Sequence, residues 1–194
     1  ENDESLIACT QMAHALGQSV MLAPHLWGRV WCGDWHAEDE AGWVVLFDEY
    51  RRFILHYAAV AQYAGCDALL IGKELGGTSG REAEWRALVA AIRRVYEGPL
   101  IYDANWNEEY RDIRWWDAVD LMGVSQYTPL SQSDAPTDAE LLAGARAVAD
   151  SLDAVATRVH RRYLLAEVGF TAEAGAARNP WSESEGRTPD NYIQ

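Results

Sequence analysis

The sequence of 194 residues predicts an α/β fold, a (β/α)8 TIM barrel of which only part is present. Short and almost continuously apolar runs alternate with longer segments of helical periodicity, which is typical of a parallel sheet covered on both faces. Polar residues gather directly after each apolar run, whereas an open doubly wound sheet would concentrate them at one switch point. The glycine-rich phosphate turn of a nucleotide-binding sheet is also absent from the sequence.

The first half of the chain contains two helical segments, each followed by an apolar run. Helices are predicted over 3–17 and 42–64, because apolar residues recur there at helical spacing and a glycine stands where each would stop. The apolar runs that follow, 19–23 and 68–72, are predicted as buried strands.

The second half continues the alternation. A helix is predicted over 81–96 and another over 137–161. The latter opens with a capping-box pattern. In this pattern the hydroxyl of Thr137 accepts a hydrogen bond from the backbone amide of Glu140, and the carboxylate of Glu140 accepts one from the backbone amide of Thr137. The remaining runs predicted as strands are 99–102, 120–124 and 163–166.

The composition and net charge of the chain indicate which kinds of binding partner are excluded. The net charge of −14 argues against nucleic acid or an anionic membrane surface, because the summed field would repel polyanions. No apolar run approaches the roughly 20 residues that a membrane-spanning helix needs. The first residues lack the basic and apolar regions of a signal peptide, and the sequence leaves the compartment open. We expect a single domain over 1–194.

Two glutamates stand at the ends of apolar runs. Glu74 follows Leu70 and Gly72 at a spacing of two, so in an extended strand all three side chains project to one side, and Glu167 follows Leu165 in the same way. Paired carboxylates on separate strands are what glycoside hydrolysis requires, one as proton donor and one as nucleophile. The alternative is that either glutamate forms an ion pair with an arginine at the rim.

Aromatic residues also collect after the strands. Nine tryptophans occur in the chain, and five of them fall in loops that follow strands, namely Trp27, Trp31, Trp35, Trp106 and Trp181. Indole rings stack on the flat C–H faces of sugars, which favours a cleft for a neutral polysaccharide, although packing beneath a loop is the alternative for each tryptophan. The adjacent pair Trp115 and Trp116 is expected to pack in the core instead.

Five segments together resemble glycoside hydrolase family 113, a family of retaining β-mannanases built on the (β/α)8 barrel of clan A. The similarity extends over nearly the whole chain and keeps the order of the motifs. Counting the first predicted strand as the third of the barrel places Glu74 after the fourth and Glu167 after the seventh. The segments are VMLAPHLW (20–27), IGKEL (71–75) with REAEW (81–85), GPLIYDANW (98–106), WDAVDLMGV (116–124) and LAEVGF (165–170).

This resemblance implies a role for each candidate residue. Glu74 would be the general acid/base, Glu167 the nucleophile, and Tyr127 the hydrogen-bond donor that holds Glu167 ionised. The carboxyl groups of the two glutamates would lie about 5–5.5 Å apart, and no metal or organic cofactor would be needed. The residues implied to line the sugar-binding subsites are His25, Trp27, Asn105 and Trp106. Gln126 and Trp181, which also follow strands, are expected to bind the same β-1,4-mannan-type oligosaccharide or polysaccharide.

The sequence departs from the family pattern at two positions. Lys73 stands before the expected acid/base, where related sequences usually have asparagine, and Ala23 stands where a lysine is expected. Strand alternation would turn Lys73 away from the side of Glu74. The five predicted strands correspond to strands three to seven of a barrel, without the first two and the eighth. If the chain is truly incomplete, the exposed edge strands of the sheet would favour self-association.

Three alternatives to a mannan-cleaving enzyme remain open. The chain could be a catalytically inactive carbohydrate-binding barrel or a retaining β-glycosidase of other sugar specificity. It could also be a metal-dependent hydrolase that uses His25, Asp34 and His36, although these residues lack a recognisable metal-ligand spacing.

Overall fold

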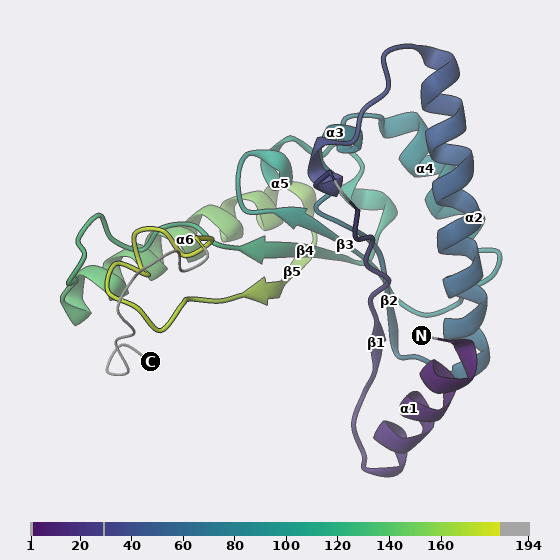
Figure 1. Cartoon of the computed structure of the whole chain (residues 1–194), viewed down its shortest axis with the longest axis horizontal. Coiled ribbons are helices and arrows are strands. Elements are labelled where there is room, and N and C mark those ends of the chain that lie inside the picture. Colours follow the sequence, from purple (N-terminus) through teal and green to yellow (C-terminus); the bar gives the residue numbers. More distant parts are fainter. Residues whose placement is uncertain (1, 29, 183–194) are drawn as a thin grey trace.

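Five parallel strands, adjacent in the order of the sequence, form one curved sheet in the computed structural model, which describes residues 2–28 and 30–182 (Figure 1). All four neighbouring pairs are parallel. The order never reverses, as in a barrel and unlike a doubly wound sheet, so the prediction of a partial (β/α)8 barrel is confirmed. The strands are β1 (Met21–Leu22), β2 (Ala68–Lys73), β3 (Leu100–Asn105), β4 (Leu121–Gln126) and β5 (Arg162–Val168).

Helices connect most of the strands, and the predicted helices are all present. The capping box at the start of the last long helix is confirmed by reciprocal hydrogen bonds between Thr137 and Glu140. The connection from β3 to β4 is shorter than a usual crossover helix, with one turn of α-helix and one of 3-10 helix. The long helices are α1 (Asp3–Ala15), α2 (Glu40–Ala64), α4 (Glu82–Ile92) and α6 (Asp138–Val159). The short ones are η1 (Cys32–Asp34), α3 (Gly76–Ser79), α5 (Glu109–Asp112) and η2 (Trp116–Ala118).

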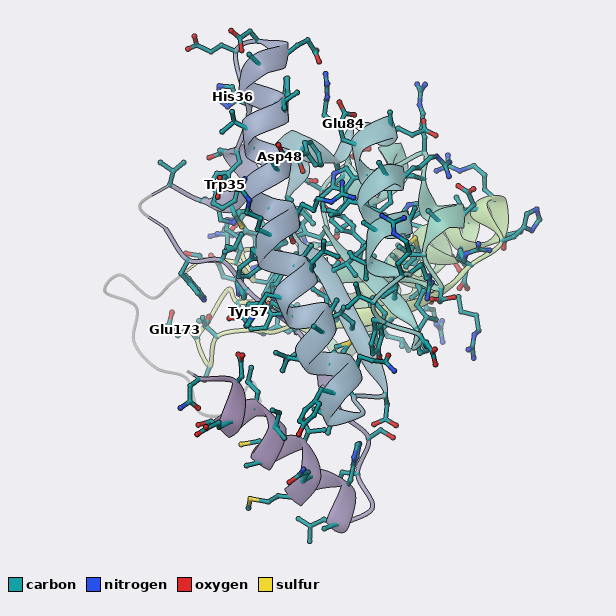
Figure 2. The ribbon with its side chains drawn as sticks, turned by 90° about the vertical axis from the view of Figure 1, so that its right-hand side faces the viewer. Trp35, His36, Asp48, Tyr57, Glu84 and Glu173 are labelled. Atoms are coloured by element: carbon teal, nitrogen blue, oxygen red, sulfur yellow. The ribbon has the colours of Figure 1, made fainter. Side chains whose placement is uncertain are left out.

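Helices cover the outer side of the curved sheet. In Figure 1, α2 and α4 lie beside the β1–β2 end and α6 lies behind β4 and β5. In the view turned by 90°, α2 lies in front of the sheet, and α1 lies near the C-terminal end of α2 (Figure 2). No helix in the described ranges is both long and apolar enough to cross a membrane.

An aromatic cluster forms the core between the sheet and these helices. Trp85 of α4 is fully buried and stacks on Trp115, with ring centroids 4.8 Å apart. Tyr102 of β3 meets both indoles edge-on at about 5 Å. The indole N–H groups are not left unpaired, because Trp85 donates to the carbonyl of Thr78 and Trp115 to that of Ser79. Trp115 therefore packs in the core, as predicted.

Candidate active site

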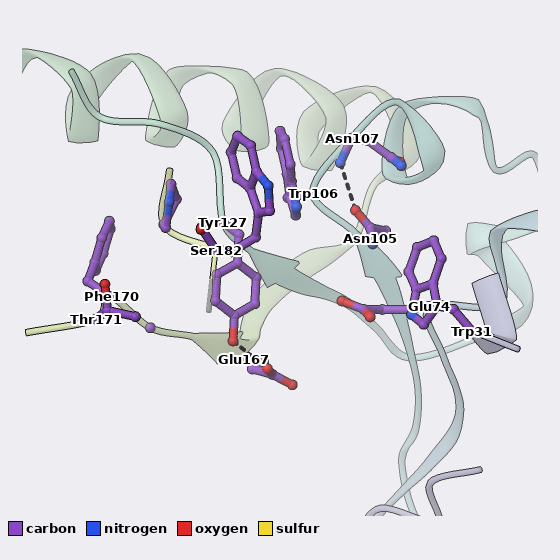
Figure 3. Close-up of a pocket in the computed structure, with 13 residues that line it drawn as sticks. Trp31, Glu74, Asn105, Trp106, Asn107, Tyr127, Glu167, Phe170, Thr171 and Ser182 are labelled. Atoms are coloured by element: carbon purple, nitrogen blue, oxygen red, sulfur yellow. Dashed lines mark hydrogen bonds between the residues drawn. The ribbon is translucent and has the colours of Figure 1, made fainter. Parts of the chain in front are cut away.

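A cavity of about 750 Å³ lies at the carboxyl ends of the strands, where barrel enzymes place their sites (Figure 3). The carboxylates of Glu74, directly after β2, and Glu167, within β5, both face it. Tyr127, directly after β4, lies beside Glu167. The other residues lining the cavity are Trp31, Asn105, Trp106, Asn107, Gly169, Phe170, Thr171, Pro180, Trp181 and Ser182.

The backbone at Glu74 is in an unusual conformation. Its φ of +51° is in the left-handed region, which residues with a β-carbon rarely adopt. Hydrogen bonds to β3 hold it there: the amide of Glu74 donates to the carbonyl of Asp103 at 2.7 Å, and the amide of Leu75 donates to the Tyr102 hydroxyl at 3.2 Å. Such strain is typical of functional positions. The carboxyl of Glu74 has no hydrogen bond or ion pair to any other residue in the described ranges.

The route by which Glu74 reaches the cavity differs from the prediction. Between β2 and β3 the register advances from Leu70 to Lys73 on one strand and only from Ile101 to Asp103 on the other, so β2 contains an extra residue. A bulge of this kind reverses the alternation of side chains. A Cβ on Gly72 would meet the rings of Tyr102 and Trp85 on the helix-covered side. The expectation that Gly72 and Glu74 share one side was therefore wrong.

The same bulge corrects the expectation for Lys73. Its side chain does not turn away from Glu74 but points into the barrel, where it lines a second cavity together with both glutamates. The register between β4 and β5 is shifted similarly, since Val124 pairs with Leu165 and the next residue of β4 pairs with Glu167. Extra residues in β2 and β5 thus set the faces from which Lys73 and Glu167 project.

Both carboxylate oxygens of Glu167 accept hydrogen bonds. The hydroxyl of Tyr127 donates to Oε1, and Nζ of Lys73 donates to Oε2. Two donors, one of them charged, favour the ionised carboxylate and fix its orientation. Burial, with the nearby negative charges of Glu74 and Asp103, raises the pKa of Tyr127, which keeps its hydroxyl protonated as a donor.

A buried carboxylate lies beneath this pair. Asp103 of β3 is fully buried, and its Oδ2 accepts a hydrogen bond from the Ser125 hydroxyl at 2.8 Å and lies 3.9 Å from Nζ of Lys73. Burial raises the pKa of Asp103 to about 6. Four adjacent strands thus each contribute one polar side chain, Lys73, Asp103, Ser125 and Glu167, to the interior of the half-barrel.

Aromatic and amide side chains form one flank of the main cavity. Trp106 and Trp181 stack with ring centroids 5.1 Å apart, and both line the cavity. Asn105 lies at the end of β3, where its side-chain oxygen accepts a hydrogen bond from the amide of Asn107 at 3.2 Å. Three of the residues predicted to bind sugar are thus together on this flank.

Two further predicted residues line a second cavity next to the first. His25 and Trp27 line the second cavity, of about 420 Å³, which shares Trp31 and both glutamates with the first. The His25 and Trp27 rings are 4.7 Å apart. Burial and the charge of Lys73 lower the pKa of His25, which favours its neutral form.

Gln126 is placed differently. It is buried at the end of β4, and its side-chain oxygen accepts hydrogen bonds from the backbone amide and the hydroxyl of Thr128, at 3.0 and 2.7 Å. The side-chain oxygen of Gln126, a residue predicted to bind sugar, thus caps a turn of its own loop.

The residues considered for a metal centre are separated. His25 lies in the second cavity, whereas His36 lies in the loop before α2, where its Nδ1 is 2.9 Å from the backbone oxygen of Asp34 (Figure 2). Within residues 2–28 and 30–182, no three histidine, cysteine, aspartate or glutamate side chains are placed to hold a metal ion.

Trp31, one of the tryptophans predicted to follow the strands, lines both cavities. Two buried acidic residues near the site were not predicted from the sequence. Glu109 of α5 is buried, and it accepts hydrogen bonds from the Tyr102 hydroxyl at 2.6 Å and the Asn105 amide at 2.7 Å. Its position four residues after Asn105 was the available signal. The sequence also contained a signal for Asp103, because it is a charged residue within an otherwise apolar strand.

The family model for glycoside hydrolase family 113 matches residues 1–194. The chain belongs to this family. Among solved structures, a GH113 β-mannanase from Alicyclobacillus acidocaldarius in complex with ManMIm is 28% identical, with a TM-score of 0.82 over 97% of this chain. A GH113 β-1,4-mannanase in a complex structure is 24% identical, with a TM-score of 0.83 over 97% of this chain.

The chain spans 58–59% of the length of these two structures. A fungal β-1,4-galactanase is similar in fold alone, at 16% identity and a TM-score of 0.58, with 89% of this chain and 58% of that one covered. A search of curated proteins found no match. The predicted resemblance to glycoside hydrolase family 113 and the predicted barrel fold are confirmed.

Proposed function

We propose that the protein containing this chain is a retaining glycoside hydrolase that cleaves β-1,4-linked mannan-type polysaccharide. The observation that carries the proposal is the pair of carboxylates facing one cavity in different surroundings. Glu167 accepts hydrogen bonds from a hydroxyl and an ammonium group, whereas the carboxyl of Glu74 is free to meet a ligand. Carboxylates in contrasting environments are the usual basis for dividing nucleophile and acid roles.

The first half of the proposed reaction uses both groups. Glu167 attacks the anomeric carbon and forms a covalent glycosyl–enzyme bond, while protonated Glu74 donates its proton to the departing glycosidic oxygen. The hydroxyl of Tyr127 holds one oxygen of Glu167 in place during this attack.

The second half releases the sugar. Glu74, now ionised, removes a proton from a water molecule that attacks the anomeric carbon, and the bond to Glu167 breaks. The product regains the β configuration, because two inversions at one carbon cancel.

The two cavities support an extended ligand. They share both glutamates, and Trp106 and Trp181 line the first cavity whereas His25 and Trp27 line the second. Indole faces suit the C–H faces of neutral sugars. The two similar structures are a β-mannanase and a β-1,4-mannanase, which supports mannan as the polymer. The partner we propose is accordingly a neutral β-linked oligosaccharide or polysaccharide.

Chemical rescue tests the two roles separately in the full-length protein. With an aryl β-mannoside that has a good leaving group, Glu74→Ala should be reactivated by azide and give the β-mannosyl azide. Glu167→Gly should be reactivated by azide to give the α-mannosyl azide, because azide then enters the vacated space on the opposite face. Glu49→Gln, an exposed change on α2, is the matched control and should retain full activity.

Product stereochemistry gives an independent check. Proton NMR of the first products from manno-oligosaccharides should show the β anomer. Early α anomer would exclude Glu167 as a nucleophile. Binding of manno-oligosaccharides by the wild-type protein without any hydrolysis would instead identify an inactive carbohydrate-binding barrel.

A further inference from the structure

Lys73 is a cation placed between two carboxylates inside the half-barrel. Its Nζ donates to Glu167 and lies 3.9 Å from Oδ2 of Asp103, and its side chain is only 16% exposed. Of the residues that line the two cavities around the glutamates, Lys73 alone carries a fixed positive charge. Among the residues that the structure describes around the cavities, its ammonium group is therefore the main source of positive potential at Glu167.

Asp103 is the second partner of this ammonium group. It is fully buried, and its Oδ1 has no hydrogen-bond partner in the part of the chain that the structure describes. An ionised carboxylate in such surroundings is costly unless a cation is close. The bulge in β2 makes Lys73 the register partner of Asp103 and thereby supplies that cation.

We infer that Lys73 is a positioning residue for the proposed reaction, which holds Glu167 ionised and oriented while its charge is shared with Asp103. The inference rests on the proposed function, because it assigns Lys73 a task at the proposed nucleophile. An asparagine at this position, as expected from related sequences, could donate a hydrogen bond but would supply no charge.

The other titratable groups around Glu167 act differently. When ionised, Glu74 and Asp103 oppose ionisation of Glu167 by their negative charge, and Tyr127 donates a neutral hydrogen bond. His25 lines the same second cavity, where the Lys73 charge and burial favour its neutral form. Lys73 is thus the group that offsets the surrounding carboxylates.

Replacing the charge tests the inference by its pH signature. In the full-length protein, Lys73→Met should move the acidic limb of the kcat/KM profile upward by about one pH unit or more, because loss of a cation within hydrogen-bonding distance disfavours the carboxylate. Lys73→Arg should restore most of the wild-type profile, and Lys73→Gln serves if the methionine variant does not fold. A merely structural lysine would lower the yield or thermal stability of Lys73→Met without moving this limb.

Asp103→Asn tests the sharing in the pH range where Asp103 is ionised. Because burial raises the pKa of Asp103 to about 6, its carboxyl competes for the Lys73 ammonium group above that pH and is neutral below it. Lys73→Met should therefore raise the titration midpoint of Asp103, whose carbon-13 signal is assigned from Asp103→Asn, whereas Asp103→Asn should leave the acidic limb nearly in place. An unchanged Asp103 midpoint in Lys73→Met would overturn the sharing.

A readout that needs no substrate separates this inference from the proposed function. Carbon-13 NMR of the full-length protein, labelled at glutamate side-chain carboxyls, follows Glu167 directly, with its signal assigned from Glu167→Gln. Its titration midpoint should rise in Lys73→Met by the same amount as the kinetic limb. An unchanged midpoint would overturn the inference even if mannan is hydrolysed. Absence of any glycosidase activity alongside a shifted midpoint would overturn the proposed function alone.

Discussion

The indole rings of Trp106 and Trp181 stack on each other beside the main cavity, with centroids 5.1 Å apart and planes inclined by 20°. One follows β3 and the other lies beyond β5, so the contact joins two segments that are distant in sequence. Stacked indoles form a rigid apolar wall, which is suited to binding a sugar ring without rearrangement. The stack also makes each ring dependent on the other for its position.

Removing one ring should weaken substrate binding more than catalysis. We expect Trp181→Ala to raise KM for manno-oligosaccharides about tenfold with kcat nearly unchanged, because a stacking surface of this kind contributes about 1.4 kcal/mol. Steady-state kinetics of the full-length protein measures both constants. Trp43→Ala, which removes an indole packed against Arg81 on the outer helices, is the control and should leave KM unchanged. Equal KM values in the two variants would contradict the assignment.

The hydroxyl of Tyr127 should matter to the chemical step. Tyr127→Phe removes the donor to Oε1 of Glu167 while keeping the ring, and we expect kcat to fall about 100-fold with KM changed little. Rates with saturating substrate measure this loss. Tyr63→Phe, on the exposed side of α2, removes a hydroxyl of the same kind and should have no effect. Full activity of Tyr127→Phe would show that Lys73 alone suffices to hold Glu167.

Glu109 should make the stability of the fold depend on pH. Burial raises its pKa to about 7, so the folded chain binds a proton more tightly than the unfolded one. Its contribution to the free energy of unfolding is therefore fully present below about pH 4.5 and is lost as the pH rises through 7. Between pH 4.5 and 7, the decrease in the free energy of unfolding should be about 3 kcal/mol smaller in Glu109→Gln than in the wild type. Denaturant titrations at pH 4.5, 6 and 7.5 measure it.

The matched control for this prediction is the neighbouring residue. Glu108 is mostly exposed and pairs with Arg111, so Glu108→Gln should reproduce the wild-type pH dependence. If the free energy of unfolding changes with pH in Glu109→Gln as it does in the wild type, the buried carboxyl of Glu109 does not retain its proton near neutral pH.

Gly77 should be essential to the position of the loop that carries Trp31. A Cβ on Gly77 would lie 2.2 Å from the carbonyl oxygen of Trp35, a backbone atom that cannot move aside alone. We expect Gly77→Ala to destabilise the protein by about 1–3 kcal/mol and to raise KM, since η1 must shift. Thermal unfolding and kinetics test both effects. Gly80→Ala meets no atom within 4 Å and should be tolerated; a similar loss in both variants would exclude the steric explanation.

The sequence predicted the architecture well, because its signals are local. Apolar runs and helical periodicity located all five strands and the long helices, and the Thr137–Glu140 pattern predicted a capping box that the structure contains. The same reasoning selected Glu74 and Glu167 from their positions after apolar runs. The structure brings both to one cavity.

What could not be predicted depends on pairing between strands. Strict alternation turned Lys73 outward, but an extra residue in β2 reverses its direction, and a bulge is defined only by the neighbouring strand. The positive φ of Glu74 is likewise set by hydrogen bonds to β3. Gln126 looked like a ligand to sugar by its position, whereas its oxygen is used within its own turn.

The extra residues in β2 and β5 also bear on how relatives should be aligned. Deleting one residue between Leu70 and Lys73 would keep Lys73 and Glu74 in the sequence yet exchange which side chains of β2 point inward and which meet the helices. Insertions and deletions in these two strands therefore matter more than most substitutions. A homologue that keeps the lysine–glutamate pair but differs in length just before it would have a different interior.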